Sequence, residues 1–167
     1  MVAAQLPKGL SYQTDYLSPE HEAYLRDWCD TQSWMTTLSR RVQQYGYRYD
    51  YKARRVKPSD KIGELPDAIG QLADMFVSQG IFVTRPDQVI VNEYLPGQGI
   101  AAHVDCVPCF GGVIASVCLL SSCVMRFERG REKREIQLRP RSLIVMKGEA
   151  RTGWRHAIPH RKTDRID

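Results

Sequence analysis

A His-x-Asp motif, His103-Val104-Asp105, closes an apolar run that is typical of a β-strand. Alternate residues of a strand point to the same side, so both side chains can reach one metal ion. Such a motif arises often by chance and does not establish a metal site alone. A second histidine, His156, follows 53 positions downstream, after two or three further expected strands. Together these three residues are candidate metal ligands.

Two histidines and one carboxylate on neighbouring strands form a facial triad, which leaves three adjacent coordination positions open. Iron(II) needs such positions to hold a bidentate co-substrate and dioxygen at the same time. Zinc-dependent hydrolysis would accept the same ligands. The triad by itself therefore leaves the reaction open.

A Cys-x-x-Cys sequence, Cys106-Val107-Pro108-Cys109, comes directly after the motif and could bind zinc or cycle as a dithiol. A single pair is a weak signal for either role, so we expect two reduced loop residues near the metal. The chain has five cysteines and no N-terminal apolar core long enough for a secretory signal. A reducing, cytoplasmic location is expected.

Two helices are expected to precede the motif. Ser18-Pro19-Glu20 combines a capping hydroxyl, an early proline and an early acid, which predicts a helix from Pro19 to Asp30. A second helix is expected to open at Pro66 and to close at Gly80. Its apolar stripe at helical spacing consists of Ile69, Leu72, Ala73, Phe76 and Val77.

The segment between the two helices is rich in tyrosine. From Trp34 to Lys57 the tyrosines alternate strictly with other residues, which predicts a β-ribbon with aromatic side chains on one face. These tyrosines are Tyr45, Tyr47, Tyr49 and Tyr51.

Short β-rich runs separated by turn signals fill the chain from Gln88 onward: QVIVNEY, IAAHVD, GVIASVCLL, CVMRFE, REIQL, SLIVMK and a segment from Arg151 to Ile158. Several short strands after a helical layer predict an α+β chain built on a β-sandwich or jelly roll. At 167 residues one domain is the expectation, and no apolar run approaches the ~20 residues that span a bilayer.

The charge favours a polyanionic partner. The formal net charge is +5 and the pI is near 9.0. Long-range attraction to nucleic acid would follow and would weaken with salt, although a solvated basic surface gives the same number.

The order of motifs from Gln88 to Asp164 resembles the AlkB family of iron(II) and 2-oxoglutarate dependent dioxygenases. The shared motifs are Asn92-Glu93-Tyr94, Pro96-Gly97, His103-Val104-Asp105, Ser142-Leu143, and Trp154-Arg155-His156 with Ile158. Upstream, Arg41-Val42-Gln43-Gln44-Tyr45-Gly46-Tyr47 is similar to the nucleotide-recognition lid of the subfamily that contains the tRNA-modifying AlkB homologues. The resemblance implies a double-stranded β-helix with N-terminal helices and a lid over about 34–57.

The resemblance also implies the roles of individual residues. His103, Asp105 and His156 would bind Fe(II), and Asn92 and Tyr94 would hydrogen-bond 2-oxoglutarate. The lid residues that would contact the substrate are Arg41, Tyr45, Tyr47, Arg48 and Tyr49. For any one tyrosine, packing of a hairpin onto the core is an equally good interpretation.

The implied activity is oxidative demethylation of alkylated bases in DNA or RNA, tRNA among them. Dioxygen and 2-oxoglutarate are consumed, succinate forms, and a substrate carbon is hydroxylated. Where that carbon is an N-methyl group, formaldehyde leaves and the base is restored. The target base must be flipped out or already single-stranded. Two alternatives are a tRNA-base hydroxylase of the same family and a catalytically impaired nucleic-acid binder.

Two departures from the family pattern bear on these alternatives. The sequence stops at Asp167, before the last family strand, whose arginine pairs with the distal carboxylate of 2-oxoglutarate; Arg161 and Arg165 lie near the expected place. Val107 stands where direct DNA-repair members carry an acid. A valine cannot accept a hydrogen bond from a base amino group or balance a cationic base.

Overall fold

The computed structural model describes residues 6–161, and the chain forms two compact units. Unit 1 contains Met1–Glu22 and Tyr94–Asp167, and unit 2 contains Ala23–Glu93. The His-x-Asp motif and His156 both belong to unit 1. The single domain expected over 1–167 stays a prediction.

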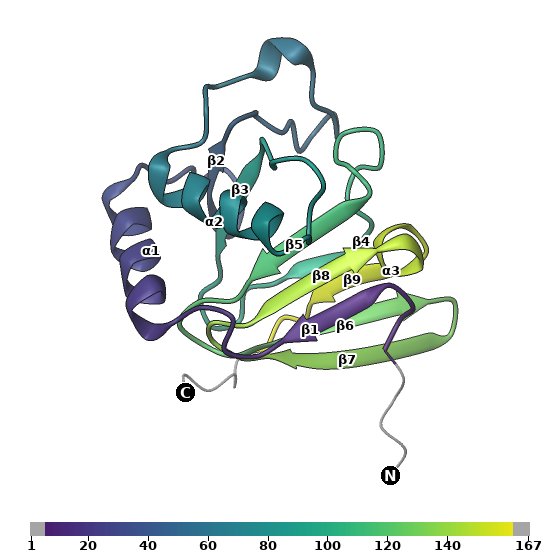
Figure 1. Cartoon of the computed structure of the whole chain (residues 1–167). Coiled ribbons are helices and arrows are strands. Elements are labelled where there is room, and N and C mark those ends of the chain that lie inside the picture. The colour runs from purple at the N-terminus through teal and green to yellow at the C-terminus, as the bar shows by residue number, and fades with distance from the viewer. Residues whose placement is uncertain (1–5, 162–167) are drawn as a thin grey trace. The chain divides into compact units, whose positions relative to one another are not determined.

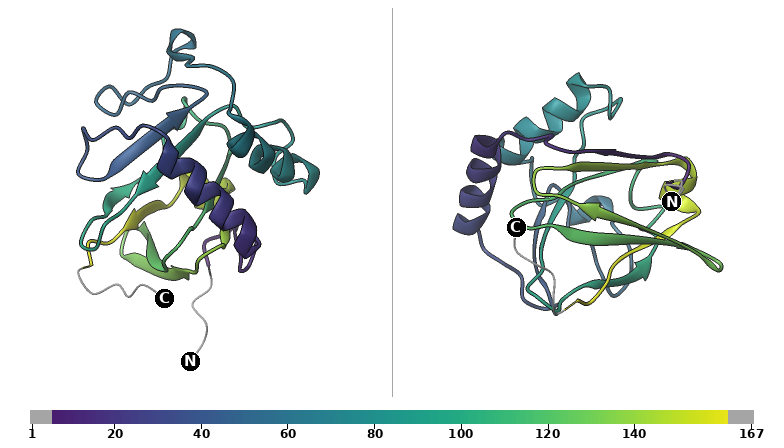
Figure 2. Two further views of the ribbon diagram at one scale, coloured as in Figure 1. Left: turned by 90° about the vertical axis from the view of Figure 1, so that its left-hand side faces the viewer. Right: turned by 90° about the horizontal axis from the view of Figure 1, so that it is seen from below.

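Unit 1 is a sandwich of two antiparallel sheets (Figures 1 and 2). The first has the order β1-β8-β5, with β1 at Leu10–Gln13, β5 at Val113–Val117 and β8 at Leu143–Lys147. The second has the order β4-β9-β6-β7, with bounds Ile100–His103, Arg155–Ile158, Cys123–Arg129 and Glu132–Leu138. A short helix, α3 (Gly148–Thr152), joins β8 to β9.

The core of unit 1 lies between these two sheets because each strand turns its apolar positions inward. Alternation is clearest in β6, where Met125 and Phe127 are buried while Arg126 and Glu128 between and beyond them are not. The buried cluster is Met125, Phe127, Leu138, Ile144, Met146, Ala150, Trp154 and Ile158. This is the jelly-roll arrangement that the sequence predicts.

Unit 2 combines helices with a two-stranded sheet. Helix α1 (Pro19–Thr31) begins in unit 1 and continues into unit 2, β2 (Arg41–Tyr45) pairs antiparallel with β3 (Val89–Glu93), and α2 spans Asp67–Ser78. A 3-10 turn, η1, covers Pro58–Asp60. Leu65, Ile69 and Ala73 form the small core, with Trp28, Tyr45 and Val89 packed against it.

Both helix predictions are confirmed within one or two residues at each end, and Ile69, Ala73 and Phe76 of the predicted stripe are buried. The predicted ribbon over 34–57 is wrong in its extent. One strand forms there, β2, and the strand that pairs with it is β3; within the segment itself the pairing is limited to isolated bridges, Met35 with Val42 and Asp50 with Arg55. Residues 46–57 turn away because Gly46 takes a φ of +78° and Arg54 a φ of +51°, which extended strands do not contain.

No helix within residues 6–161 combines the length and the apolar character needed to cross a bilayer.

Candidate metal centre

His103, Asp105 and His156 converge in unit 1, and the ligand atoms that they offer all lie within 4.8 Å of one another. His103 Nε2 is 3.5 Å from Asp105 Oδ1, and His156 Nε2 is 3.6 Å from Asp105 Oδ2. Two imidazoles and one carboxylate form a donor set that suits iron(II), and all three groups face one point. The predicted ligands are therefore brought together.

The sheet register explains this convergence. Strands β4 and β9 are antiparallel neighbours, and His103 stands directly opposite His156. The ring centroids of the two histidines are 4.4 Å apart. On the other side of β9, His156 stands opposite the fully buried Phe127. The histidine pair is thus fixed by backbone pairing, and Asp105 reaches it from the first residues after β4.

Hydrogen bonding fixes the orientation of His103. Its Nδ1 lies 2.8 Å from the carbonyl oxygen of Ala101, so Nδ1 carries the proton and donates it. Nε2 is then the ring atom that faces Asp105. His156 also turns Nε2 toward Asp105, while its buried Nδ1 has no hydrogen-bond partner among residues 6–161. Both rings direct Nε2 to the centre.

The charge states also suit metal binding. Burial lowers the pKa of His156 to about 4 against the attraction of Asp105, so this imidazole is neutral at pH 7, the form that coordinates metals. Burial would raise the pKa of Asp105, but the His103 hydrogen bond and nearby positive charge outweigh it and hold that pKa below its usual value. At pH 7 Asp105 is therefore anionic and His156 neutral.

Arg151, in α3, holds the loop that follows Asp105. Its guanidinium is buried, with 2% of the residue exposed. It donates to the carbonyl oxygens of Asp105 at 3.0 Å and Gly111 at 3.2 Å, and more weakly to those of Phe110 and Cys106 at 3.4 and 3.5 Å. Burial lowers the pKa of Arg151 against the attraction of Asp105. One side chain thus connects the Asp105 loop to the helix that precedes His156.

Sequence reasoning missed this arginine because the segment from Arg151 was interpreted as the start of a strand. In the structure α3 occupies Gly148–Thr152, and β9 begins only at Arg155. A buried arginine in a five-residue helix leaves no periodic signal. The available hint was a lone charged residue close upstream of a candidate ligand.

Cys106 and Cys109 form a disulfide, so the expectation of two reduced loop residues is wrong for this structure. Their Cα atoms are 5.2 Å apart because the backbone turns there, with the Cys109 and Phe110 amides both donating to the Cys106 carbonyl oxygen. Because the two sulfurs are bonded to each other, this pair is not a zinc site in the structure. The bridge and Arg151 both restrain the loop after Asp105.

The two residues expected to bind 2-oxoglutarate fall in different units. Tyr94 is half-buried and packs against the core of unit 1. Asn92, at β3 in unit 2, accepts a hydrogen bond from Arg40 Nε at 2.8 Å through Oδ1. Their roles toward 2-oxoglutarate stay predictions.

The arginines near the C-terminus and Val107 also have defined places. Arg161 forms an ion pair with Glu135 at 3.3 Å, whereas Arg165 lies outside the described residues. Val107 is 55% exposed at the tip of the disulfide loop.

The lid candidates divide into two groups. Arg41 pairs through two hydrogen bonds with Glu93, at 2.6 and 2.8 Å, and stacks 4.3 Å over Trp34. Tyr45 packs 5.2 Å from Trp28 and donates a hydrogen bond to Gln43 Oε1 at 2.8 Å. Arg41 and Tyr45 therefore hold unit 2 together.

The other candidates lie in the irregular stretch that follows β2, where Arg48 is exposed. Tyr47 is half-buried next to η1, and Arg48 and Tyr49 help to line a hollow of about 570 Å³ in unit 2. Tyr49 contacts Tyr51 edge to face, with ring centroids 5.0 Å apart. The hollow is lined by Met35, Thr37, Leu38, Arg48, Tyr49, Asp50, Tyr51, Lys52 and Asp60.

Tyr45→Ala should destabilise the fold rather than impair substrate contact alone. Burial raises the pKa of Tyr45 to about 12, and the ring contacts the small core of unit 2. Removing it should lower the free energy of unfolding by roughly 2–4 kcal/mol, measured by urea denaturation. Tyr49→Ala, which loses one edge-to-face contact, should lower it by at most about 1 kcal/mol. Equal losses would show that Tyr45 is no more structural than Tyr49.

Residues 4–166 match the family model of the 2OG-Fe(II) oxygenase superfamily. The alkylated DNA repair protein ALKBH8 homolog of Arabidopsis thaliana is 31% identical over 95% of this chain and 53% of its own length. The tRNA (carboxymethyluridine(34)-5-O)-methyltransferase alkbh8 of Xenopus tropicalis is 36% identical over 99% of this chain. The chain spans about half of the first relative and 27% of the second.

The solved structure of OsALKBH1 has the same fold. The TM-score is 0.72 at 15% identity, over 93% of this chain and 86% of that one. The jelly roll and the family resemblance predicted from the sequence are confirmed. So are the enzyme class, an iron(II) and 2-oxoglutarate dependent dioxygenase, and its cofactors Fe(II), 2-oxoglutarate and O2.

Proposed function

We propose that this chain, which belongs to the 2OG-Fe(II) oxygenase superfamily and is of the AlkB type, oxidatively demethylates alkylated bases in DNA or RNA. The observation that carries the proposal is the convergence of His103, Asp105 and His156 within 4.8 Å in a chain of this family. The names of both relatives, one for alkylated DNA repair and one for tRNA modification, favour a nucleic-acid substrate.

Iron(II) held by the three ligands would supply the oxidising chemistry, in which O2 and 2-oxoglutarate are consumed and the substrate carbon is hydroxylated. The protein fixes the positions of the metal ligands and their protonation states. Asp105 presents its negative charge to a dication, His156 is in the neutral form that coordinates metals, and Phe127 stands opposite His156 on β6. Main-chain pairing of β4 with β9 fixes the spacing before any metal binds, which lowers the ordering cost of binding.

Substrate selection is assigned to unit 2, through the hollow lined by Arg48, Tyr49 and Tyr51. A base that is acted on must leave its stack, and an aromatic ring can replace the lost stacking with roughly 1–3 kcal/mol per base. Arg48 and Lys52 beside these rings add positive charge for the phosphates. Of the five substrate residues predicted from sequence, Arg48 and Tyr49 are the best placed for this role.

A tRNA-base hydroxylase is the second candidate, and Val107 favours it. The exposed valine offers neither charge nor hydrogen-bond acceptor to a cationic methylated base. The similarity to a relative named for uridine modification in tRNA points the same way. A catalytically impaired nucleic-acid binder is the third candidate and predicts binding without succinate formation.

The test is a coupled assay on the full chain loaded anaerobically with iron(II). Succinate is measured after oxygen is admitted, with and without a single-stranded oligonucleotide containing 1-methyladenine. The mass of the oligonucleotide before and after the reaction is determined by mass spectrometry. A second arm uses unmodified and modified tRNA. We expect succinate formation coupled one to one to loss of the methyl group.

Each outcome separates the three candidates. Turnover on tRNA with none on the methylated oligonucleotide would contradict the demethylase and support the tRNA-base hydroxylase. Salt-sensitive binding of either nucleic acid without succinate would identify a non-catalytic binder. The chain with unmodified oligonucleotide is the control for uncoupled consumption of 2-oxoglutarate.

A further inference from the structure

Most unpaired positive charge of unit 1 lies at one edge. Among residues 6–161, five exposed Lys or Arg side chains of this unit have no hydrogen bond, ion pair or ring contact. Four of them form what we call the positive rim, and the fifth, Arg139, lies elsewhere. The rim residues are Lys8, Arg131, Lys133 and Lys147.

The rim lies at the edge where the metal ligands are. His156 is the second residue of β9, and Lys147, at the end of β8, is joined to β9 by α3. Lys8 is beside Lys147, whose amide donates to the Gly9 carbonyl oxygen at 2.8 Å. Arg131 lies in the β6–β7 turn, four residues past Phe127, which stands opposite His156.

The β6–β7 turn is tight and well defined. Arg129 pairs with Glu132, so only Gly130 and Arg131 connect the strands, and Gly130 has the φ of +57° that a two-residue hairpin takes at its first position. At about 3.4 Å per residue the turn extends roughly 10 Å beyond the level of His156. The hairpin therefore projects past the metal edge of the sheet.

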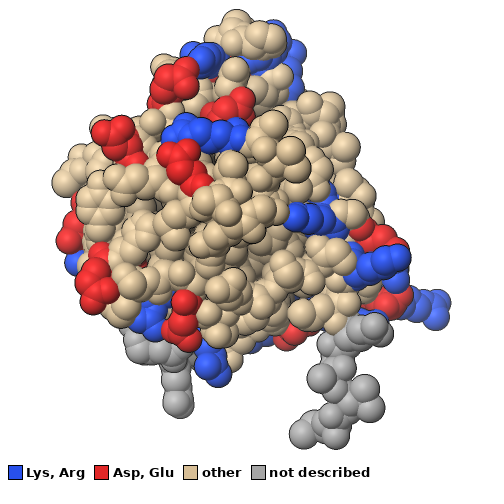
Figure 3. Space-filling view, in the orientation of Figure 1, with Lys and Arg blue, Asp and Glu red and all other residues tan. Residues whose placement is uncertain are grey.

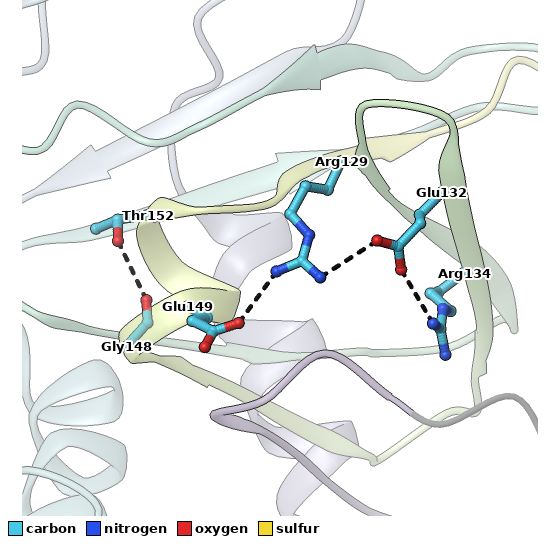
Figure 4. Close-up of polar contacts among 6 residues, drawn as sticks. All are labelled: Arg129, Glu132, Arg134, Gly148, Glu149 and Thr152. Atoms are coloured by element: carbon cyan, nitrogen blue, oxygen red, sulfur yellow. Dashed lines mark hydrogen bonds and ion pairs between the residues drawn. The ribbon is translucent and has the colours of Figure 1, made fainter.

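Ion pairs anchor the hairpin end to the helix before His156. Arg129 donates to Glu149 of α3 at 3.1 Å and to Glu132 at 3.3 Å (Figure 4). Its guanidinium also lies 4.5 Å over the ring of Trp154. Arg134 donates to Glu132 at 3.1 Å. These arginines are engaged in anchoring, which leaves Arg131 and Lys133 as the hairpin cations available to a partner.

Positive charge is in excess at this edge. Figure 3 shows Lys and Arg side chains at the lower right, interspersed with Asp and Glu, around the hairpin end of β6 and β7. Cations that already have carboxylate partners are largely neutralised, whereas those of the rim are not. A row of unpaired cations beside a metal centre fits a repeating anion whose target group must enter that centre.

We propose that the positive rim binds the phosphodiester backbone of the nucleic-acid substrate on unit 1. The partner rests on the proposed function, but the surface is separate from the lid residues and from the metal ligands. Each neutralised phosphate of a single strand releases counterions, so log K falls with log salt by about 0.7 per contact. Lys8, Arg131, Lys133 and Lys147 make the rim an electrostatic contact that carries no base selectivity.

The test compares Arg131→Gln with Arg139→Gln in the full chain. Both arginines are unpaired and lose the same charge, but Arg139 follows the other end of β7, roughly 27 Å from the turn at 3.4 Å per residue. Binding of a fluorescent 20-nucleotide single strand is followed by anisotropy across a salt series. Arg131→Gln should weaken binding about 5-fold at 0.1 M salt and lower the salt slope by about 0.7. Arg139→Gln should change neither.

Adding Lys133→Gln to Arg131→Gln should weaken binding roughly 25-fold and lower the slope by about 1.4. Succinate formation without nucleic acid should be unchanged, because neither residue touches the centre. Equal effects of the Arg131 and Arg139 substitutions, or an unaltered salt slope, would contradict phosphate binding by the rim. So would binding to phosphatidylserine vesicles that exceeds oligonucleotide binding and falls in the same variants. Rim-dependent binding by a chain without methyl removal would keep this inference and reject the proposed function.

Discussion

Asp105→Ala should abolish tight iron binding and with it all coupled turnover. Substitution of residues that only support metal ligands already lowers affinity by about 10–100-fold, so loss of the sole anionic ligand should exceed about 100-fold. A direct readout is the effect of metal on unfolding. A metal at 100 times its Kd stabilises the native chain by about 2.7 kcal/mol, and this gain should vanish in the variant.

The experiment requires a carboxylate control outside the centre. Asp15 is exposed and pairs with Arg141 at 2.7 Å, so Asp15→Ala removes an ion pair of unit 1 without touching a ligand. It should keep the full metal-dependent stabilisation. Oligonucleotide affinity should stay near the wild-type value in both variants. Metal affinity within 10-fold of wild type in Asp105→Ala would remove this aspartate from the ligand set.

The fold was predictable where local periodicity and turn chemistry agree. Ser18-Pro19 begins α1, Pro66 precedes α2, and β-rich runs with glycine turns produce the sandwich. β1 and α3 were not predicted because each has only four or five residues, too few for a period to stand out. The ribbon failed because alternation of tyrosines also arises in an irregular segment, where Gly46 ends the strand.

The metal ligands were predictable because residue type and sequence spacing together restrict which side chains can form a metal site. The disulfide was not, since Cys106-Val107-Pro108-Cys109 reads the same whether its sulfurs are reduced or bonded. Tyr45 shows a different limit. Its phenol could stack on a base or fill a core, and only the contact with Trp28 distinguishes the two. Contacts distant in sequence, like those of Arg151, are created by the fold and leave no local pattern.

Arg151→Met should both weaken metal binding and lower stability, because the same guanidinium positions the Asp105 loop and satisfies buried carbonyl oxygens. The carbonyl oxygens of Asp105 and Gly111 lose their nearest side-chain donor in a buried site. Unsatisfied buried acceptors cost about 1–3 kcal/mol each, so the metal-free chain should lose roughly 2–6 kcal/mol of unfolding free energy. With the Asp105 loop released, metal affinity should fall about 10–100-fold. Denaturant melts without metal and cobalt(II) titration of folded protein measure the two effects separately.

Arg151→Lys distinguishes positioning from simple filling of space. Lysine keeps the positive charge beside Asp105 but lacks the planar fork that reaches several carbonyls at once. Stability should recover by more than half while cobalt affinity stays below wild type. Arg155→Met is the matched control, since Arg155 adjoins His156 but is exposed and pairs with Glu128 at 3.4 Å. It should change stability by no more than about 0.5 kcal/mol and leave affinity intact. If Arg151→Met lost stability yet bound cobalt as tightly as wild type, Arg151 would support the fold without positioning Asp105.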